Sequence, residues 1–148
     1  MRIERIIGFR VAIIAAACFM LPSPVEAQPA EDPEPSAESR LAVVWTSADP
    51  DVAHRVCLMY THAARKANWF NEVRLIVWGP SARLLAADKD LQAKVKDMME
   101  DGVIVQACIV CADSYGVTQT LRGLGIEVKG MGQPLTRMLK DGYKVLTF

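Results

Sequence analysis

Short, mostly apolar runs alternate with amphipathic segments from residue 41 to residue 148. Such runs are typical of strands buried on both faces, as in a parallel sheet. The pattern predicts five strands, over residues 41–45, 73–78, 103–107, 126–128 and 143–148.

Between these runs, apolar residues recur at steps of three and four, the spacing of helices with one buried side. Asp49 followed by Pro50 predicts the start of the first helix, which runs to about residue 68. Ser81 is predicted to cap a short helix, and Asp88 to begin the next one. Later helical segments are predicted over residues 112–117, 118–124 and 134–140. Strands that alternate with helices predict an α/β fold, a three-layer α/β/α domain with a five-stranded, mainly parallel sheet.

The first 27 residues follow a different pattern. Arginines within residues 1–10 precede an unbroken apolar run over 11–21, and a small-residue pattern follows at 25–27. These are the three parts of a secretory signal peptide, with cleavage expected after Ala27. The run is too short to cross a bilayer, which takes about 20 apolar residues. We therefore expect a periplasmic or secreted chain with no stable membrane insertion after cleavage.

A lipoprotein attached through Cys18 is the alternative, which the apolar residues 19–21 directly after it disfavour. Residues 28–40 combine proline and acidic residues with no large apolar side chain, the composition of a disordered linker. The folded domain is then expected over residues 41–148.

Charge and composition exclude two classes of protein. The chain has 17 Lys and Arg against 17 Asp and Glu, and a nucleic-acid-binding protein would usually show a basic excess. Hydrophobic residues make up 51% of the chain, too many for a disordered protein. We expect an ordinary folded domain that does not bind nucleic acid.

Three cysteines remain after the signal peptide and Cys18 are removed, namely Cys57, Cys108 and Cys111. An odd number in an exported chain means at least one free thiol or a bond to another chain. Cys57 lies between Val56 and Leu58 inside the first predicted helix, so we predict an inert thiol in the core.

Cys108 follows a buried strand and precedes a helix. Unpaired backbone N–H groups and the helix dipole favour an anion at such a position, which lowers the pKa of a thiol. We predict a reactive thiolate at Cys108, with Cys111 one helical turn further on and within reach. The alternative is that both are small core residues at a strand–helix junction.

Two other readings of the cysteine pair stay open. A metal site needs three or four ligands, and the remaining candidates, His54 and His62, lie on another helix at polar, solvent-facing positions. A thioredoxin-like redox motif usually carries Gly, Pro or His between its cysteines, where this chain has Ile109 and Val110. We favour a site without metal and without cofactor.

Ligands of parallel sheets bind beyond the carboxyl ends of the strands. Trp45, Ser47, Trp78 and Met131 follow or close three of the predicted strands. We predict that they line a partly apolar binding pocket near Cys108, with core or subunit-interface positions as the alternative for the large side chains.

Four segments together resemble the DsrE/DsrF-like proteins, and the likeness extends over essentially all of residues 41–148. They are Val-Gln-Ala-Cys at 105–108, Gly-Val at 116–117, Trp-Gly-Pro-Ser at 78–81 and Gly-Tyr-Lys-Val-Leu-Thr-Phe at 142–148. The resemblance implies a flavodoxin-like sheet and assembly into homo-oligomers such as trimers or hexamers. In sulfur-relay members, a cysteine at the end of the third strand carries sulfur as a persulfide. Cys108 matches that cysteine, whereas Cys111 is shared by only some members.

Three hypotheses of function follow. The first is an exported, sulfurtransferase-like carrier that holds sulfane sulfur as a persulfide on Cys108, with a sulfur donor or acceptor protein or a small sulfur compound as its partner. Characterised sulfur-relay members work in the cytoplasm, so an exported member would need other partners. The second is a thiol–disulfide or redox-sensing protein that uses Cys108 and Cys111. The third is a non-catalytic, oligomeric binding module.

Overall fold

The chain from residue 39 onward is built around one parallel sheet. The structure, a computed structural model, describes residues 39–148, so the predicted signal peptide and most of the predicted linker lie outside the described residues. The strands hydrogen-bond in the order β4–β3–β2–β1–β5, and every pairing is parallel. Their bounds are Arg40–Trp45 (β1), Glu72–Val77 (β2), Ile104–Cys108 (β3), Glu127–Lys129 (β4) and Lys144–Thr147 (β5). The five predicted strands are confirmed, with small shifts at their ends.

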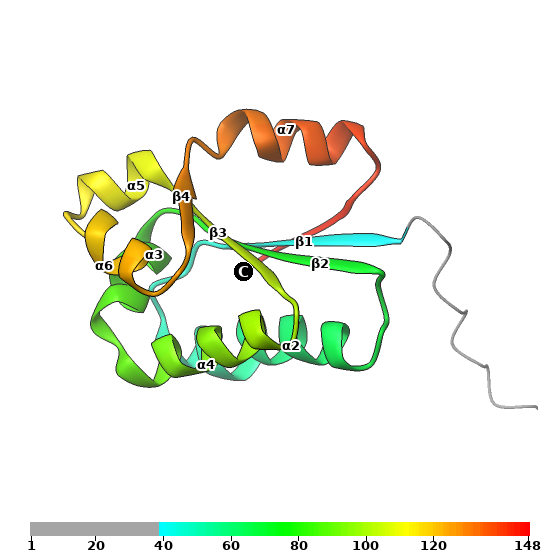
Figure 1. The fold of residues 1–148 in the computed structure, drawn as a ribbon, viewed down its shortest axis with the longest axis horizontal. Coiled ribbons are helices and arrows are strands. Elements are labelled where there is room, and N and C mark those ends of the chain that lie inside the picture. The colour runs from blue at the N-terminus through cyan, green and yellow to red at the C-terminus, as the bar shows by residue number, and fades with distance from the viewer. Residues whose placement is uncertain (1–38) are drawn as a thin grey trace, which may run out of the picture. The chain divides into compact units, whose positions relative to one another are not determined.

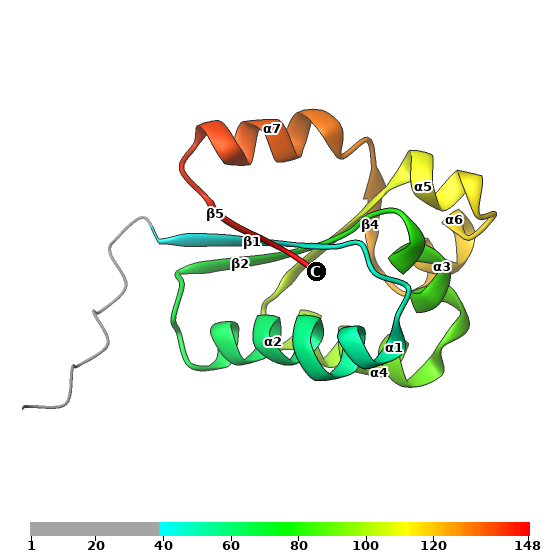
Figure 2. The same ribbon diagram turned by 180° about the vertical axis from the view of Figure 1, so that it is seen from behind.

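Helices cover both faces of the sheet, which confirms the three-layer α/β/α prediction. In Figures 1 and 2, α2 and α4 lie on one face and α7 lies on the other. No helix within residues 39–148 is long and apolar enough to cross a membrane. The helical elements are α1 (Pro50–Val52), the π-helical segment η1 (Ala53–Cys57), α2 (Leu58–Lys66), α3 (Pro80–Ala87), α4 (Lys89–Glu100), α5 (Ile109–Ser114), α6 (Thr118–Gly123) and α7 (Gly132–Lys140).

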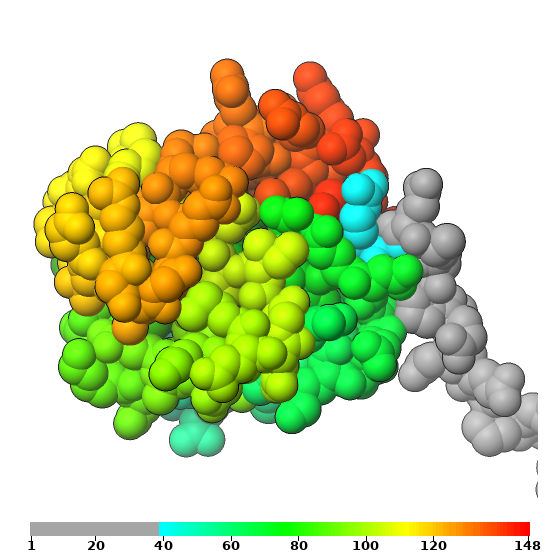
Figure 3. Space-filling view, viewed as in Figure 1, coloured from blue at the N-terminus to red at the C-terminus, as the bar shows by residue number. Residues whose placement is uncertain are grey.

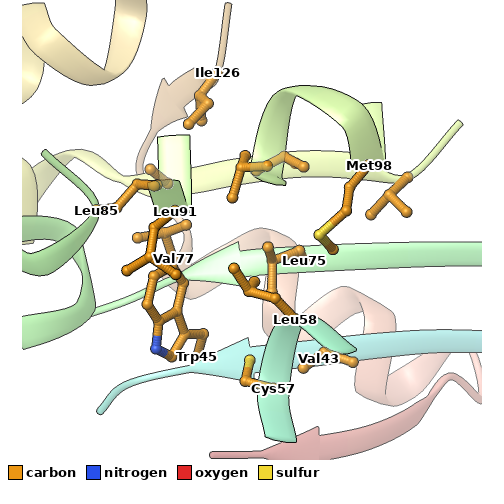
Figure 4. Packing of buried hydrophobic residues seen from close by; sticks show 14 of the residues in the cluster. Val43, Trp45, Cys57, Leu58, Leu75, Val77, Leu85, Leu91, Met98 and Ile126 are labelled. Carbon is orange, nitrogen blue, oxygen red and sulfur yellow. The ribbon is translucent and has the colours of Figure 1, made fainter. Parts of the chain in front are cut away.

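Alternation along the strands divides the apolar residues into two clusters. In β2, Val73, Leu75 and Val77 face the larger cluster, which packs beneath α2 and α4, and Figure 4 shows its centre. Ile76 points to the opposite face, where α7 packs. The buried members of this smaller cluster are Ala42, Val44, Ile76, Cys108, Met131 and Met138. Cys57 belongs to the larger cluster and is fully buried, which confirms its prediction as a core residue.

Two of the three predicted helix starts are confirmed. The side chain of Asp49 accepts hydrogen bonds from the N–H groups of Asp51 and Val52, and Pro50 occupies the first helical position. Asp88 caps α4 in the same way.

The predicted cap at Ser81 is wrong. Gly79 precedes α3 instead, with φ 67° and ψ −138°, a backbone conformation that favours glycine. Ser81 is fully buried, and its hydroxyl donates to the carbonyl of Trp45 at 2.6 Å and accepts from the N–H of Trp78 at 3.1 Å. Ser81 thus ties the ends of β1 and β2 together.

The predicted exposure of His62 is also wrong. His62 is 9% exposed, its Nε2 lies 2.6 Å from Oδ2 of Asp101, and Nζ of Lys94 lies 2.6 Å from its Nδ1. The helical pattern of α2 alone did not reveal this, because both partners come from α4 and the turn that follows it. His54, by contrast, is exposed, with its Nε2 3.7 Å from Oδ2 of Asp88.

Candidate functional site

Cys108 is both the last residue of β3 and the residue that precedes α5. Its extended backbone, with φ −73° and ψ 118°, leads the chain out of the strand and directly into the helix. The helix therefore begins three residues earlier than the pattern of residues 112–117 predicts. Its first N–H groups have no partner within the helix and point back toward the strand end.

A group of backbone N–H donors surrounds the sulfur of Cys108. The N–H groups of Cys111, Met131 and Val110 all donate hydrogen bonds to Sγ. Burial raises the pKa of the Cys108 thiol, but these bonds, together with one from the Cys111 side chain, outweigh burial and hold the pKa below its ordinary value. The site stabilises a thiolate at Cys108.

The pKa of Cys111 is shifted in the opposite direction. Burial raises the pKa of its thiol, and the adjacent Cys108 raises it further, although the N–H of Gly79 acts in the other direction. The side chain of Cys111 therefore acts as the donor and Sγ of Cys108 as the acceptor of the hydrogen bond between them. Neither cysteine is in a disulfide.

The side chain between the two cysteines is exposed and apolar. Val110, between the two cysteines, is 71% exposed, while Cys108 itself is only 5% exposed. Tyr115 follows α5 and is exposed, with the guanidinium carbon of Arg83 5.4 Å from its ring centroid. Within residues 39–148, no three His, Cys, Asp or Glu side chains form a group that could hold a metal ion.

Two of the four predicted pocket residues lie in the cluster of Cys108. Met131 is fully buried there, and Trp78 is half-buried and packs against the same cluster. Trp78 follows β2, and Met131 follows β4. Both strands pair with β3, so their carboxyl ends flank the end of β3 where Cys108 lies.

Trp45 and Ser47 are not brought to Cys108. Trp45 is fully buried in the larger cluster, on the other face of the sheet. Ser47 lies beyond the end of β1, where its Oγ accepts from the N–H of Asp49 at 3.1 Å. The N–H groups of Thr46 and Ser47 also donate to the carbonyl oxygen of Phe148, at 2.6 and 3.2 Å. The end of β1 is therefore engaged with the last residue of the chain.

The sequence reasoning missed two backbone groups of the site, the N–H of Met131 and the N–H of Gly79. Both belong to Gly-containing turns at strand ends, which the sequence shows. Only the strand order places these turns on either side of β3.

The described chain is thus a three-layer α/β/α protein with an all-parallel sheet and a cysteine of lowered pKa at the end of its third strand. The profile of the DsrE/DsrF-like family matches residues 39–148. The chain belongs to this family, which confirms the resemblance.

Two solved structures are similar to this chain. A conserved protein of unknown function, BT1422, from Bacteroides thetaiotaomicron is 34% identical, and the match covers 76% of this chain and 97% of that one with a TM-score of 0.72. The ychN protein from E. coli shares the fold at 18% identity and a TM-score of 0.60, over 74% of this chain and 99% of that one. No curated protein matches the chain significantly.

Proposed function

We propose that this protein carries sulfane sulfur as a persulfide on Cys108. The observation that carries the proposal is the set of three backbone N–H groups that donate to Sγ and lower the pKa of the thiol. A low pKa raises the fraction of thiolate near neutral pH, and the thiolate is the nucleophile in sulfur transfer. The same donors would stabilise the anion of a Cys108 persulfide less directly, because its charge lies on the outer sulfur, one atom beyond Sγ.

The transfer balances without a cofactor. The Cys108 thiolate attacks the outer sulfur of a donor such as thiosulfate, a new S–S bond forms, and the old one breaks to release sulfite. The negative charge of the attacking thiolate remains on the outer sulfur of the Cys108 persulfide. An acceptor thiolate then attacks the outer sulfur, takes it away as its own persulfide, and regenerates the Cys108 thiolate.

A second candidate function is thiol–disulfide exchange, and the hydrogen bond between the side chains of Cys111 and Cys108 favours it. The Cys108 thiolate would attack a partner's disulfide and release one partner thiolate. Cys111 would then attack the sulfur of Cys108, form the Cys108–Cys111 bond and release the second partner thiolate, which takes up the proton of Cys111.

We also propose that the protein works outside the cytoplasm. Support comes from the arginines, the apolar run and the small-residue pattern within residues 1–27. Sequencing the N-terminus of the protein from a periplasmic fraction tests this proposal, with Gln28 expected as the first residue. An unprocessed chain in the cytoplasmic fraction would contradict it.

Mass spectrometry distinguishes the two chemical functions. After exposure to thiosulfate or polysulfide, the carrier hypothesis expects a gain of about 32 Da per sulfur on the Cys108 peptide. The gain should disappear in Cys108→Ser and persist in Cys57→Ala, the matched control. A Cys108–Cys111 linked peptide without any adduct would instead support thiol–disulfide exchange. If folded protein protects Cys108 from alkylation, both hypotheses fail and the binding module is left.

A further inference from the structure

A polar cavity lies between α7 and the middle of the sheet, on the face that α7 covers. The sheet supplies Arg74 of β2, Gln106 of β3 and Lys129 of β4, while α7 supplies Arg137 and Met138. The volume of the cavity is about 240 Å³. Pockets for drug-sized ligands measure about 300–1,000 Å³, so this one suits a smaller molecule.

The cavity offers cationic groups that the protein does not fully use. Arg74 engages Glu72 through Nε at 2.5 Å and also hydrogen-bonds the side chain of Tyr143, so part of its set of five N–H donors is used. Arg137 is exposed and has no ion pair within the same residues. Lys129 pairs with Glu127 at 2.8 Å. Arg137 and the remaining N–H donors of Arg74 are therefore available to an anion, and guanidinium binds carboxylates well because of its planar fork of donors.

One residue that lines the cavity has a buried acceptor without a donor. Gln106 is 3% exposed, and its Nε2 donates to Oε2 of Glu127 at 2.5 Å. Its Oε1 is buried and accepts no hydrogen bond within the described chain. The reverse orientation of the amide would set two acceptor oxygens against each other, so the free atom is the oxygen. A buried polar atom without a partner is rare in folded proteins.

The geometry points to a binding site for a small carboxylate that carries a hydrogen-bond donor next to its acid group, an amino or hydroxy carboxylate. The carboxylate binds to Arg74 and Arg137, and the neighbouring O–H or N–H donates to Oε1 of Gln106. Asp141 also lines the cavity, and its carboxylate favours an ammonium over a hydroxyl as that donor. Met138 packs beside the carbon skeleton.

This site is separate from the proposed sulfur chemistry. Gln106 and Cys108 face the same side of β3, about 7 Å apart along the strand. Neither cysteine lines the cavity. Cys108→Ser should therefore bind the ligand like the wild type. Failure of the carrier proposal would leave the carboxylate site unaffected, and failure of the carboxylate site would leave the carrier proposal unaffected.

Three probes of nearly equal shape test the proposal, namely L-alanine, L-lactate and propionate. They are titrated into the full chain while ¹H–¹⁵N spectra follow the side-chain amide of Gln106. We expect a saturable shift with alanine or lactate and about tenfold weaker binding of propionate, which lacks the donor. Tighter binding of alanine than of lactate would identify the ligand as an amino carboxylate. Tighter binding of lactate would identify it as a hydroxy carboxylate.

Variants locate the site. Arg137→Ala, on the exposed side of α7, should weaken binding about tenfold, whereas Lys140→Ala on the same helix, outside this cavity, should not. Gln106→Leu should remove the preference for alanine or lactate over propionate. The proposal is overturned if no probe saturates the Gln106 signal, if propionate binds as well as the other two, or if Arg137→Ala binds like the wild type.

Discussion

The backbone N–H of Met131, in the turn after β4, donates a hydrogen bond to Sγ of Cys108 at the end of β3. Two other donors to the same sulfur, Val110 and Cys111, lie within three residues of Cys108, so any strand–helix junction could supply them. Met131 is different because it reaches Cys108 only through the pairing of β3 with β4. The lowered pKa of Cys108 thus depends on strand pairing in the sheet as well as on the local turn.

The three cysteines should react with an alkylating reagent in a fixed order. Cys108 is expected first because its pKa is lowered, and Cys111 later because its pKa is raised. Burial raises the pKa of the Cys57 thiol to about 12, so it should react only after unfolding. Peptide mapping after timed exposure to iodoacetamide measures the order. Modification of Cys57 in folded protein, or of Cys111 before Cys108, would contradict the assignment.

The Cys111 side chain should tune the pKa of Cys108. Cys111→Ala removes its hydrogen bond to the thiolate and should raise the pKa of Cys108. Cys111→Ser keeps a donor at the same place and should leave the pKa closer to the wild-type value. The ultraviolet absorbance of the thiolate as a function of pH measures both, with Cys108→Ser as the blank. Equal values in the two variants would mean that the side chain of Cys111 plays no part.

The lowered pKa of Cys108 also makes the stability of the fold depend on pH. The folded-state pKa of Cys108 lies below its ordinary value, so its contribution to stability is fully present above the ordinary pKa and is lost as pH falls through the folded-state pKa. Urea unfolding across this range should show a smaller dependence on pH in Cys111→Ala than in Cys111→Ser.

Gly79→Ala should lower the free energy of unfolding by about 1–3 kcal/mol, because its φ of 67° and ψ of −138° strain any residue with a side chain. Space is not the reason, since a Cβ at this position would meet no atom within 4 Å. Gly123 in α6 has equal space and no positive φ, so Gly123→Ala is the matched control and should be neutral or stabilising. Urea denaturation compares the two. A neutral Gly79→Ala would rule out the strain.

His62 should contribute to stability through both ring nitrogens. Lys94 only donates, so Nδ1 accepts from it and Nε2–H donates to Asp101. His62→Phe keeps the ring but loses both bonds, and should cost about 1–3 kcal/mol. His54→Phe, at an exposed position on the same helical stretch, should cost less than about 0.5 kcal/mol. Urea unfolding of the two variants should therefore differ clearly, and similar midpoints would contradict a structural role for His62.

The alternation of apolar runs and amphipathic segments was sufficient to predict the layers, the five strands and the caps at Asp49 and Asp88. These features depend on local spacing and on residues next to one another in the chain. The position of Cys108 between a strand and a helix belongs to the same group, and so does the buried Cys57.

Features that depend on strand order or on helix packing could not be predicted in this way. Trp45 ends a strand as Trp78 nearly does, but their side chains pack in different clusters, which a mostly apolar strand does not distinguish. The burial of His62 depends on Lys94 and Asp101, more than 30 residues away. Export, homo-oligomer formation and the sulfur chemistry stay predictions.

The strands β4 and β5 lie at opposite edges of the sheet, and α7 connects them across its whole width. Contacts between segments distant in sequence form slowly, because the intervening chain must first be ordered. The pairing of β4 with β3 also joins separate segments, so in a newly made chain only the donors close in sequence, Val110 and Cys111, can lower the pKa of Cys108 until this pairing brings the Met131 N–H to Sγ. We expect the full reactivity of Cys108 to develop only with the folded sheet, which would limit premature reaction of a nascent chain with sulfur compounds and wrong disulfide partners.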